Sequence, residues 1–113
     1  MTEGIKIMEK PVISVITPVF NEEECLPAFY ERVVPIMEKI GLPFEIIAVD
    51  DGSRDKSLEI ISEHCKKDKR LKCVSFSRNF GQQAAFFCGL ENCSGDAAIL
   101  IDADLQDLSL IHI

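Results

Sequence analysis

The chain has 113 residues, of which 47% are apolar and 27% charged, and its net charge is −7. This is the composition of an ordinary globular domain, and the length suffices for one small domain with its own core. The acidic balance argues against nucleic acid as a partner. No apolar run could span a membrane and the five cysteines lack metal-site spacing. We therefore expect reduced thiols and a cytoplasmic protein.

Four short apolar runs, rich in β-branched residues, predict strands. They cover residues 12–17, 44–50, 71–76 and 97–102. Continuous apolar character, rather than alternation, predicts strands that are buried on both faces. The last run could instead form an exposed sheet edge, which would favour association of copies into a homo-oligomer.

Stretches with helical spacing separate these runs. The first covers residues 26–40 and contains Pro35, which should kink it. The second follows Ser53 and Asp55, both candidate N-caps, and the third follows residues 79–81. The resulting β-α-β-α-β-α-β order predicts an α/β fold. We expect a Rossmann-like parallel sheet with right-handed crossovers and helices on both faces.

In such a sheet, ligands bind beyond the carboxyl ends of the strands. The fourth run ends in "DADLQD", where Asp102, Asp104 and Gln106 occupy alternate positions. These side chains would converge if the chain stayed extended. Two carboxylates and an amide oxygen suit Mg²⁺ or Mn²⁺. The alternative is a loop of acids that caps a following helix, but the position after a predicted buried strand favours the metal.

Two further strand ends carry polar residues whose roles the sequence leaves open. In "VDDGSRD", Asp50 and Asp51 could accept hydrogen bonds from a nucleobase or a ribose, or could form an Asx-turn without a ligand. In "TPVFNEEE", Asn21 and Glu24 could form a capping box, or the loop could contact a ligand. For each segment, the residues alone favour the structural and the ligand-binding interpretation equally.

Arg78, in "SRNFGQQ", is a forked donor at the end of the third predicted strand. It could face a phosphate, or it could pair with Asp51 or Asp102. Neither His64 nor His112 has a nucleophile or metal ligands nearby in the sequence. No catalytic residue is therefore predicted.

Four segments in this order resemble the N-terminal half of a family 2 glycosyltransferase with the GT-A fold. They are "ISVITPVFNEEECLP", "FEIIAVDDGSRDKS", "SRNFGQQAAFFCGL" and "ILIDADLQD". The resemblance covers residues 11–107, after an N-terminal extension of residues 1–10. It is greatest to the branch that glycosylates polyprenyl phosphates, the dolichyl-phosphate mannose synthases and bactoprenol glucosyltransferases.

The resemblance implies a reaction and a set of site residues. The reaction is an inverting transfer of sugar from a UDP- or GDP-sugar to a polyprenyl phosphate, with Mg²⁺ or Mn²⁺ as cofactor. Nucleotide-binding residues would be Pro18, Phe20, Glu22, Asp50, Asp51 and Asp102, and metal ligands would be Asp102, Asp104 and Gln106.

After Asp107 the family usually continues with a Pro-rich turn, whereas residues 108–113 read "LSLIHI". We therefore expect a truncated, inactive donor-binding half with a non-native end at 108–113. The acceptor side, any catalytic base and membrane-attached segments would lie in the missing part. The full-length parent would work at the cytoplasmic face of a membrane. Two alternatives are a transferase with a polysaccharide or other sugar acceptor, and a non-catalytic nucleotide-binding or receiver-like signalling module.

Overall fold

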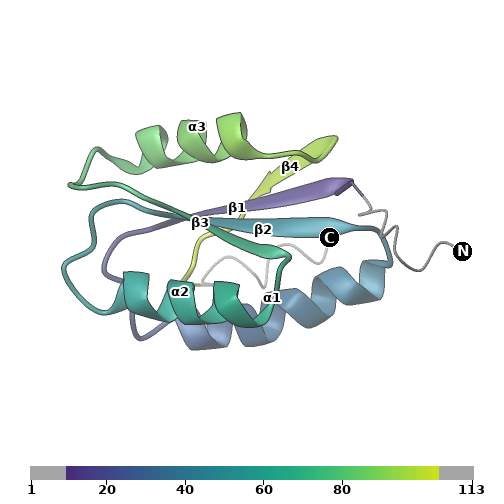
Figure 1. Ribbon diagram of the computed structural model, residues 1–113, viewed down its shortest axis with the longest axis horizontal. Helices are drawn as coiled ribbons and strands as arrows, with labels where there is room; N and C mark the ends of the chain where they lie inside the picture. Colours follow the sequence, from purple (N-terminus) through teal and green to yellow (C-terminus); the bar gives the residue numbers. More distant parts are fainter. Residues whose placement is uncertain (1–9, 105–113) are drawn as a thin grey trace, which may run out of the picture.

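The computed structural model describes residues 10–104 as seven alternating strands and helices (Figure 1). Within these residues the strands form one parallel sheet of order β3-β2-β1-β4, which confirms the predicted α/β fold. The elements are β1 (Ile13–Val19), α1 (Leu26–Ile40), β2 (Phe44–Asp50), α2 (Ser57–Lys67), β3 (Leu71–Ser75), α3 (Gln82–Asn92) and β4 (Ala97–Leu100).

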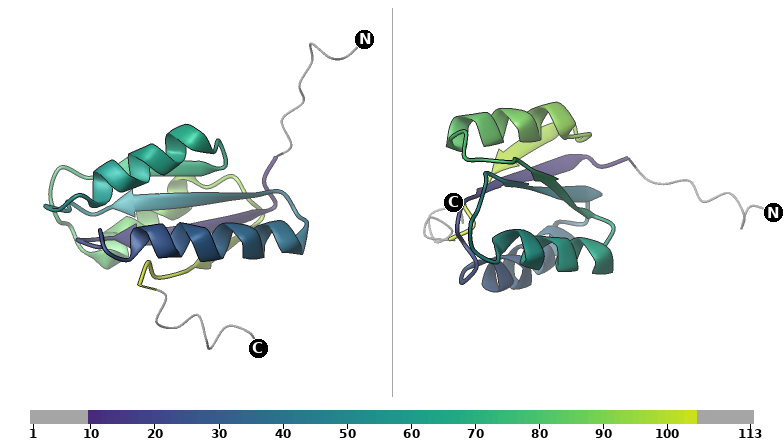
Figure 2. Two further views of the ribbon diagram at one scale, coloured as in Figure 1. Left: turned by 90° about the horizontal axis from the view of Figure 1, so that it is seen from below. Right: turned by 60° about the vertical axis from the view of Figure 1, so that its left-hand side comes forward.

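Helices cover both faces of the sheet. Figure 1 shows α1 and α2 on one face and α3 on the other, and the turned views of Figure 2 show the same layers. Along β2, Ile46 and Ala48 pack into the larger core with α1, whereas Ile47 and Val49 pack with Ala85 of α3. Every residue of β2 is buried, which confirms for this strand that a continuous apolar run marks coverage on both faces.

The larger core is built on α1, whose buried side chains share one face of the helix. Fully burying a large apolar side chain contributes roughly 1.5–3 kcal/mol, so this face supplies a main part of the folding energy. Pro35 lies within the helix, which continues beyond it to Gly41 in the left-handed region at φ 82°. The buried residues of α1 are Leu26, Phe29, Tyr30, Val33 and Met37.

Strand β4 differs from the prediction of a strand buried on both faces. All four of its residues are exposed, since among residues 10–104 it pairs with β1 alone, while α3 packs mainly on β1 and β2. The alternative of an exposed sheet edge is thus confirmed. The strand also ends at Leu100, and the chain turns at Ala103 and Asp104 instead of staying extended.

Strand β1 continues two residues past its predicted end, through Pro18 to Val19. The carbonyl oxygen of Ile16 faces β4 and accepts from the Ile101 amide at 3.1 Å, whereas that of Val19 faces β2. Main-chain groups alternate sides along a strand, so Pro18 faces the β4 side, beyond the point where β4 ends. The N–H that proline lacks is therefore not needed for a ladder bond there.

A buried carboxylate anchors the loop that leads into β4. Glu45, which is 1% exposed, accepts from Lys72 Nζ at 2.7 Å, from Ser14 Oγ at 2.6 Å and from the Ser94 amide at 2.6 Å. Burial alone would raise the pKa of this carboxyl, but these hydrogen bonds outweigh burial and hold the pKa below its ordinary value. The network ties β2 to β3 and to the α3–β4 loop.

All five cysteines are free thiols and partly buried, as predicted. Cys65 and Cys73 pack against the larger core, where burial raises the pKa of Cys73 to about 11. Within residues 10–104, no helix combines the length and apolar character needed to cross a bilayer.

Candidate functional site

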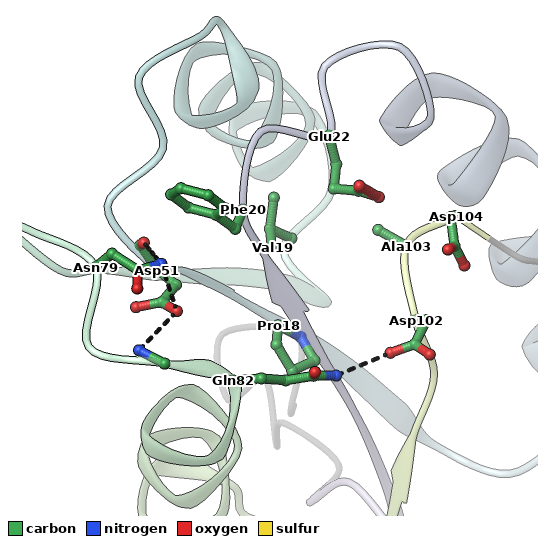
Figure 3. Close-up of a pocket in the computed structure, with 11 residues that line it drawn as sticks. Pro18, Val19, Phe20, Glu22, Asp51, Asn79, Gln82, Asp102, Ala103 and Asp104 are labelled. Carbon is green, nitrogen blue, oxygen red and sulfur yellow. Dashed lines mark hydrogen bonds between the residues drawn. The ribbon is translucent and has the colours of Figure 1, made fainter.

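A hollow of about 470 Å³ opens at the carboxyl end of the sheet, between the exits of β1 and β4 and the start of α3 (Figure 3). It brings together residues that are far apart in the sequence. Most of the predicted nucleotide-binding residues line it, together with Asp104. The lining residues are Pro18, Val19, Phe20, Glu22, Asp51, Asn79, Gly81, Gln82, Asp102, Ala103 and Asp104.

One wall of this hollow is acidic. Figure 3 shows Glu22 on the same side as Asp102 and Asp104. Burial raises the pKa of Glu22, and the charges of Asp104 and Asp102 raise it further. Crowded carboxylates of this kind favour a bound cation, because it relieves their repulsion.

The structure brings together only part of the predicted metal site. Asp102 and Asp104 share the hollow, but the chain between them is not extended, because it turns at Ala103 and Asp104. Gln106, the third predicted ligand, lies outside the described residues. Within residues 10–104, no three His, Cys, Asp or Glu side chains are close enough to hold a metal ion. The carboxylate oxygens of Asp102 and Asp104 suit a divalent cation, but these two candidate ligands alone do not define where it would bind.

Asp51, which follows β2, is buried beneath the β3–α3 loop. Its Oδ1 accepts from the Phe80 amide at 2.7 Å, and its Oδ2 accepts from the Gly81 amide and from Asn79 Nδ2, both at 3.1 Å. A carboxylate at the N-terminus of α3 is also favoured by the helix dipole. Asp51 therefore holds the start of α3 in place, and its predicted ligand contact stays a prediction.

Gln82, the first residue of α3, reaches across the hollow. Its Nε2 donates to Asp102 Oδ1 at 3.3 Å, as the dashed line in Figure 3 marks. No role was predicted for Gln82, although in the segment "NFGQQ" it follows a strand end, a turn and a glycine. This position at the start of a helix could have marked it as a site residue.

A second hollow, of about 400 Å³, lies between the exits of β2 and β3. Asp50 lines it and is 2% exposed. Its Oδ2 accepts weakly from the Ser53 amide at 3.4 Å, and its Oδ1 has no hydrogen-bond partner in the part of the chain that the structure describes. A buried acceptor without a partner is costly, so it marks a place where a ligand N–H or a water would bind.

Arg78 also lines the second hollow, where its guanidinium lies 4.1 Å from the ring centroid of Phe80. It lies over this ring, and its predicted contact with a phosphate or with an acidic loop stays a prediction. Asp51 is satisfied by amide donors from the same loop. A stacked guanidinium keeps donors for a phosphate or a base.

The β1–α1 and β2–α2 loops are clasped by reciprocal hydrogen bonds. Asn21 does not cap its own helix: its Oδ1 accepts from the Arg54 amide at 2.8 Å, and α1 has no side-chain cap. Burial alone would raise the pKa of Asp55, but hydrogen bonds from Ser57 and the Glu23 amide hold it below its ordinary value. The other clasp bonds join Asn21 N to Ser53 Oγ, Glu22 N to Ser57 Oγ, Glu23 N to Asp55 Oδ2 and Lys56 N to Glu23 Oε1.

Solved structures with the same architecture place the chain among GT-A glycosyltransferases. TarS residues 1–349 from S. aureus, in complex with UDP-GlcNAc, matches with a TM-score of 0.68 and 25% identity, over 88% of this chain and 30% of TarS. A mannosyltransferase from Pyrobaculum calidifontis, bound to GDP-Man and Mn²⁺, matches with a TM-score of 0.67 and 22% identity, over 86% of this chain and 28% of that protein. The four-stranded parallel sheet is thus the N-terminal part of a GT-A fold.

The sequence profile described as "Glycosyl transferase family 2" matches residues 14–109, so the chain belongs to that family. A bactoprenol glucosyl transferase of Shigella phage SfV is 46% identical over 84% of this chain and 31% of its own length. An undecaprenyl-phosphate 4-deoxy-4-formamido-L-arabinose transferase of Pectobacterium atrosepticum is 46% identical over 84% of this chain and 29% of its own length. The chain spans about 30% of the length of these relatives. Membership of this family excludes the alternative of a receiver-like signalling module.

Proposed function

We propose that this chain is the donor-binding part of a metal-dependent, inverting glycosyltransferase that moves a sugar from a UDP- or GDP-sugar to a polyprenyl phosphate. The observation that carries the proposal is the gathering of predicted nucleotide-binding residues around one hollow. Pro18, Phe20 and Glu22 come from the exit of β1, Asp51 from that of β2 and Asp102 from that of β4. Convergence of this kind is expected of a ligand site in a parallel sheet.

The second hollow would take the nucleobase. Uracil and guanine each carry a ring N–H, which the buried Oδ1 of Asp50 could accept. Phe20 borders both hollows and is 45% exposed, so its ring is available for stacking on a base. Arg78 would lie beside the base or the α-phosphate.

The acidic wall of the first hollow would hold Mg²⁺ or Mn²⁺ through Asp102, Asp104 and Gln106. When bound, the cation would neutralise charge on the departing nucleoside diphosphate. Glu22 adds negative charge to the same wall. Its main-chain amide donates a hydrogen bond to Ser57 Oγ at 2.8 Å, which positions the residue. The residues of this chain would thus orient the donor and leave its anomeric carbon open to attack.

The names of two relatives, which refer to undecaprenyl phosphate and bactoprenol, support a lipid phosphate as acceptor over a polysaccharide. A phosphate monoester has a second pKa of about 6, so it is already anionic at neutral pH and needs no strong base. The catalytic surroundings of that acceptor, at the cytoplasmic face of a membrane, would belong to segments other than residues 10–104.

Calorimetric titration of this chain with UDP and with GDP, each with Mn²⁺ or with EDTA, tests the proposal. We expect one nucleotide to bind, at least about tenfold more tightly with Mn²⁺, because a cation held by Asp102 and Asp104 would neutralise the charge of the diphosphate. Asp104→Ala should lose this metal dependence. Asp96→Ala, an exposed aspartate just before β4, is the matched control and should keep it. Failure of a folded chain to bind either nucleotide would overturn the proposal, as would unchanged binding by Asp104→Ala.

A further inference from the structure

We propose that Gln82 is a positioning residue for the metal that binds the donor diphosphate, and that Asp51 holds Gln82 in place. In this proposal, the Gln82 amide turns the Asp102 carboxylate toward the cation. The inference rests on the proposed function and adds to it a residue outside the predicted ligand set.

The contact that carries the inference joins two segments on opposite sides of the hollow. Gln82 begins α3, whereas Asp102 lies in the loop after β4, and the hydrogen bond between them measures 3.3 Å (Figure 3). A carboxylate has about four lone-pair positions, so the hydrogen bond from Gln82 by itself does not prevent it from binding a cation. Hydrogen bonds of this kind orient ligating carboxylates in metal sites.

The position of Gln82 is set from the far side of the site. Asp51 binds two successive main-chain amides, of Phe80 and Gly81, directly before Gln82. Gly52 packs so closely below this loop that an added Cβ would lie 2.3 Å from the carbonyl carbon of Arg78. The exit of β2 therefore fixes the first residue of α3, which in turn contacts the residue after β4.

The chemistry of an amide suits this role better than that of a charged side chain. Gln82 donates a hydrogen bond without neutralising the carboxylates that would attract the cation. A lysine would form an ion pair with Asp102 and compete with the metal, and a glutamate would add repulsion to a wall where Glu22 already has a raised pKa. A neutral donor orients Asp102 and preserves its charge.

The experiment measures free Mn²⁺ by electron paramagnetic resonance while Mn²⁺ is titrated into the chain with saturating UDP or GDP. Gln82→Met keeps the length and helix propensity of the side chain but removes its donor. Gln83→Met is the matched control, since Gln83 is the next residue in the same first turn of α3 and is also exposed. We expect about tenfold weaker Mn²⁺ binding for Gln82→Met and an unchanged value for the control.

Two further readouts separate positioning from a structural role. Nucleotide affinity in EDTA and the thermal midpoint should be unchanged in Gln82→Met, whereas a merely structural residue would shift both. Equal Mn²⁺ affinity of Gln82→Met and the wild type would overturn this inference alone, and so would equal losses with and without metal. A wild-type chain that binds neither nucleotide with Mn²⁺ would overturn the proposed function and this inference together.

Discussion

Replacing Asp51 by asparagine separates a structural role from direct ligand contact. In Asp51→Asn, the remaining oxygen can still accept from the Phe80 amide, which lies 2.7 Å from Oδ1 in the wild type. The new NH₂ group, however, would face two donors, the Gly81 amide and Asn79 Nδ2, each 3.1 Å from the present oxygen. If Asn79 turned its amide to accept from the new NH₂ group, it would lose its bond to the Asp51 carbonyl oxygen at 3.2 Å, and the main-chain amide of Gly81 cannot turn at all.

The cost follows from these contacts. A hydrogen bond to a charged group contributes about 1.5–3 kcal/mol, and a negative charge at a helix N-terminus adds about 0.3–1 kcal/mol. We therefore expect Asp51→Asn to lower the free energy of unfolding by about 3 kcal/mol, a large part of the 5–15 kcal/mol typical of domains.

Urea denaturation followed by circular dichroism measures this loss. Asp96→Asn is the matched control, because Asp96 is an exposed aspartate just before β4, and its effect should stay within about 0.5 kcal/mol. The reasoning would be refuted if Asp51→Asn cost less than about 1 kcal/mol and still abolished nucleotide binding by the folded chain. That result would make Asp51 a ligand contact and not a support for the loop.

Three further predictions concern stability. Glu45 has a lowered pKa in the folded chain, so its contribution is present above its ordinary pKa of 4.5 and is lost as the pH falls further. Wild type should thus lose more stability than Glu45→Gln between pH 5 and pH 3, and parallel urea midpoints across that range would contradict this. Gly52→Ala should cost at least about 2 kcal/mol, since φ is +73° and the added Cβ meets backbone. Gly41→Ala, at φ +82° with nothing within 4 Å, should cost only about 1 kcal/mol in the same denaturation series, and equal losses would show that the close contact is relieved. The buried hydroxyl of Tyr30 has no hydrogen-bond partner among the described residues, so Tyr30→Phe should leave the melting temperature equal or higher, and a clear decrease would indicate a bound water.

The order of strands and helices was the most predictable part of the fold. The run that became β2 was located to the residue, because its apolar residues end at a charged pair, Asp50 and Asp51. The end of β1 was misplaced, because the tolerance for Pro18 depends on where β4 stops, and that lies more than 80 residues later in the chain. Such non-local facts are not visible in a window of sequence.

The candidate site, too, was predictable from the sequence only in part. The sequence indicated which residues gather at the carboxyl ends of the strands, since parallel topology brings those ends together. It could not indicate which oxygen already has a partner. Asp50 and Asp51 are neighbours of identical chemistry, yet Asp51 binds the loop before α3 while Asp50 keeps a buried oxygen without a partner. Only the fold distinguishes them.

The clasp between the β1–α1 and β2–α2 loops affects how an alanine scan of this chain would be interpreted. Alanine at Asn21, Ser53 or Asp55 would remove a bond between two loops that border both hollows. Each substitution would reduce donor affinity and be counted as a donor contact, although part of the loss would come from the bond that holds the other loop. In a double-mutant cycle, Asn21 and Ser53 should show coupling with each other even without nucleotide, because their side chains hold the same two loops together through separate bonds. Sequence conservation among relatives would carry the same ambiguity, because residues that shape the pocket are retained as strictly as residues that touch its contents.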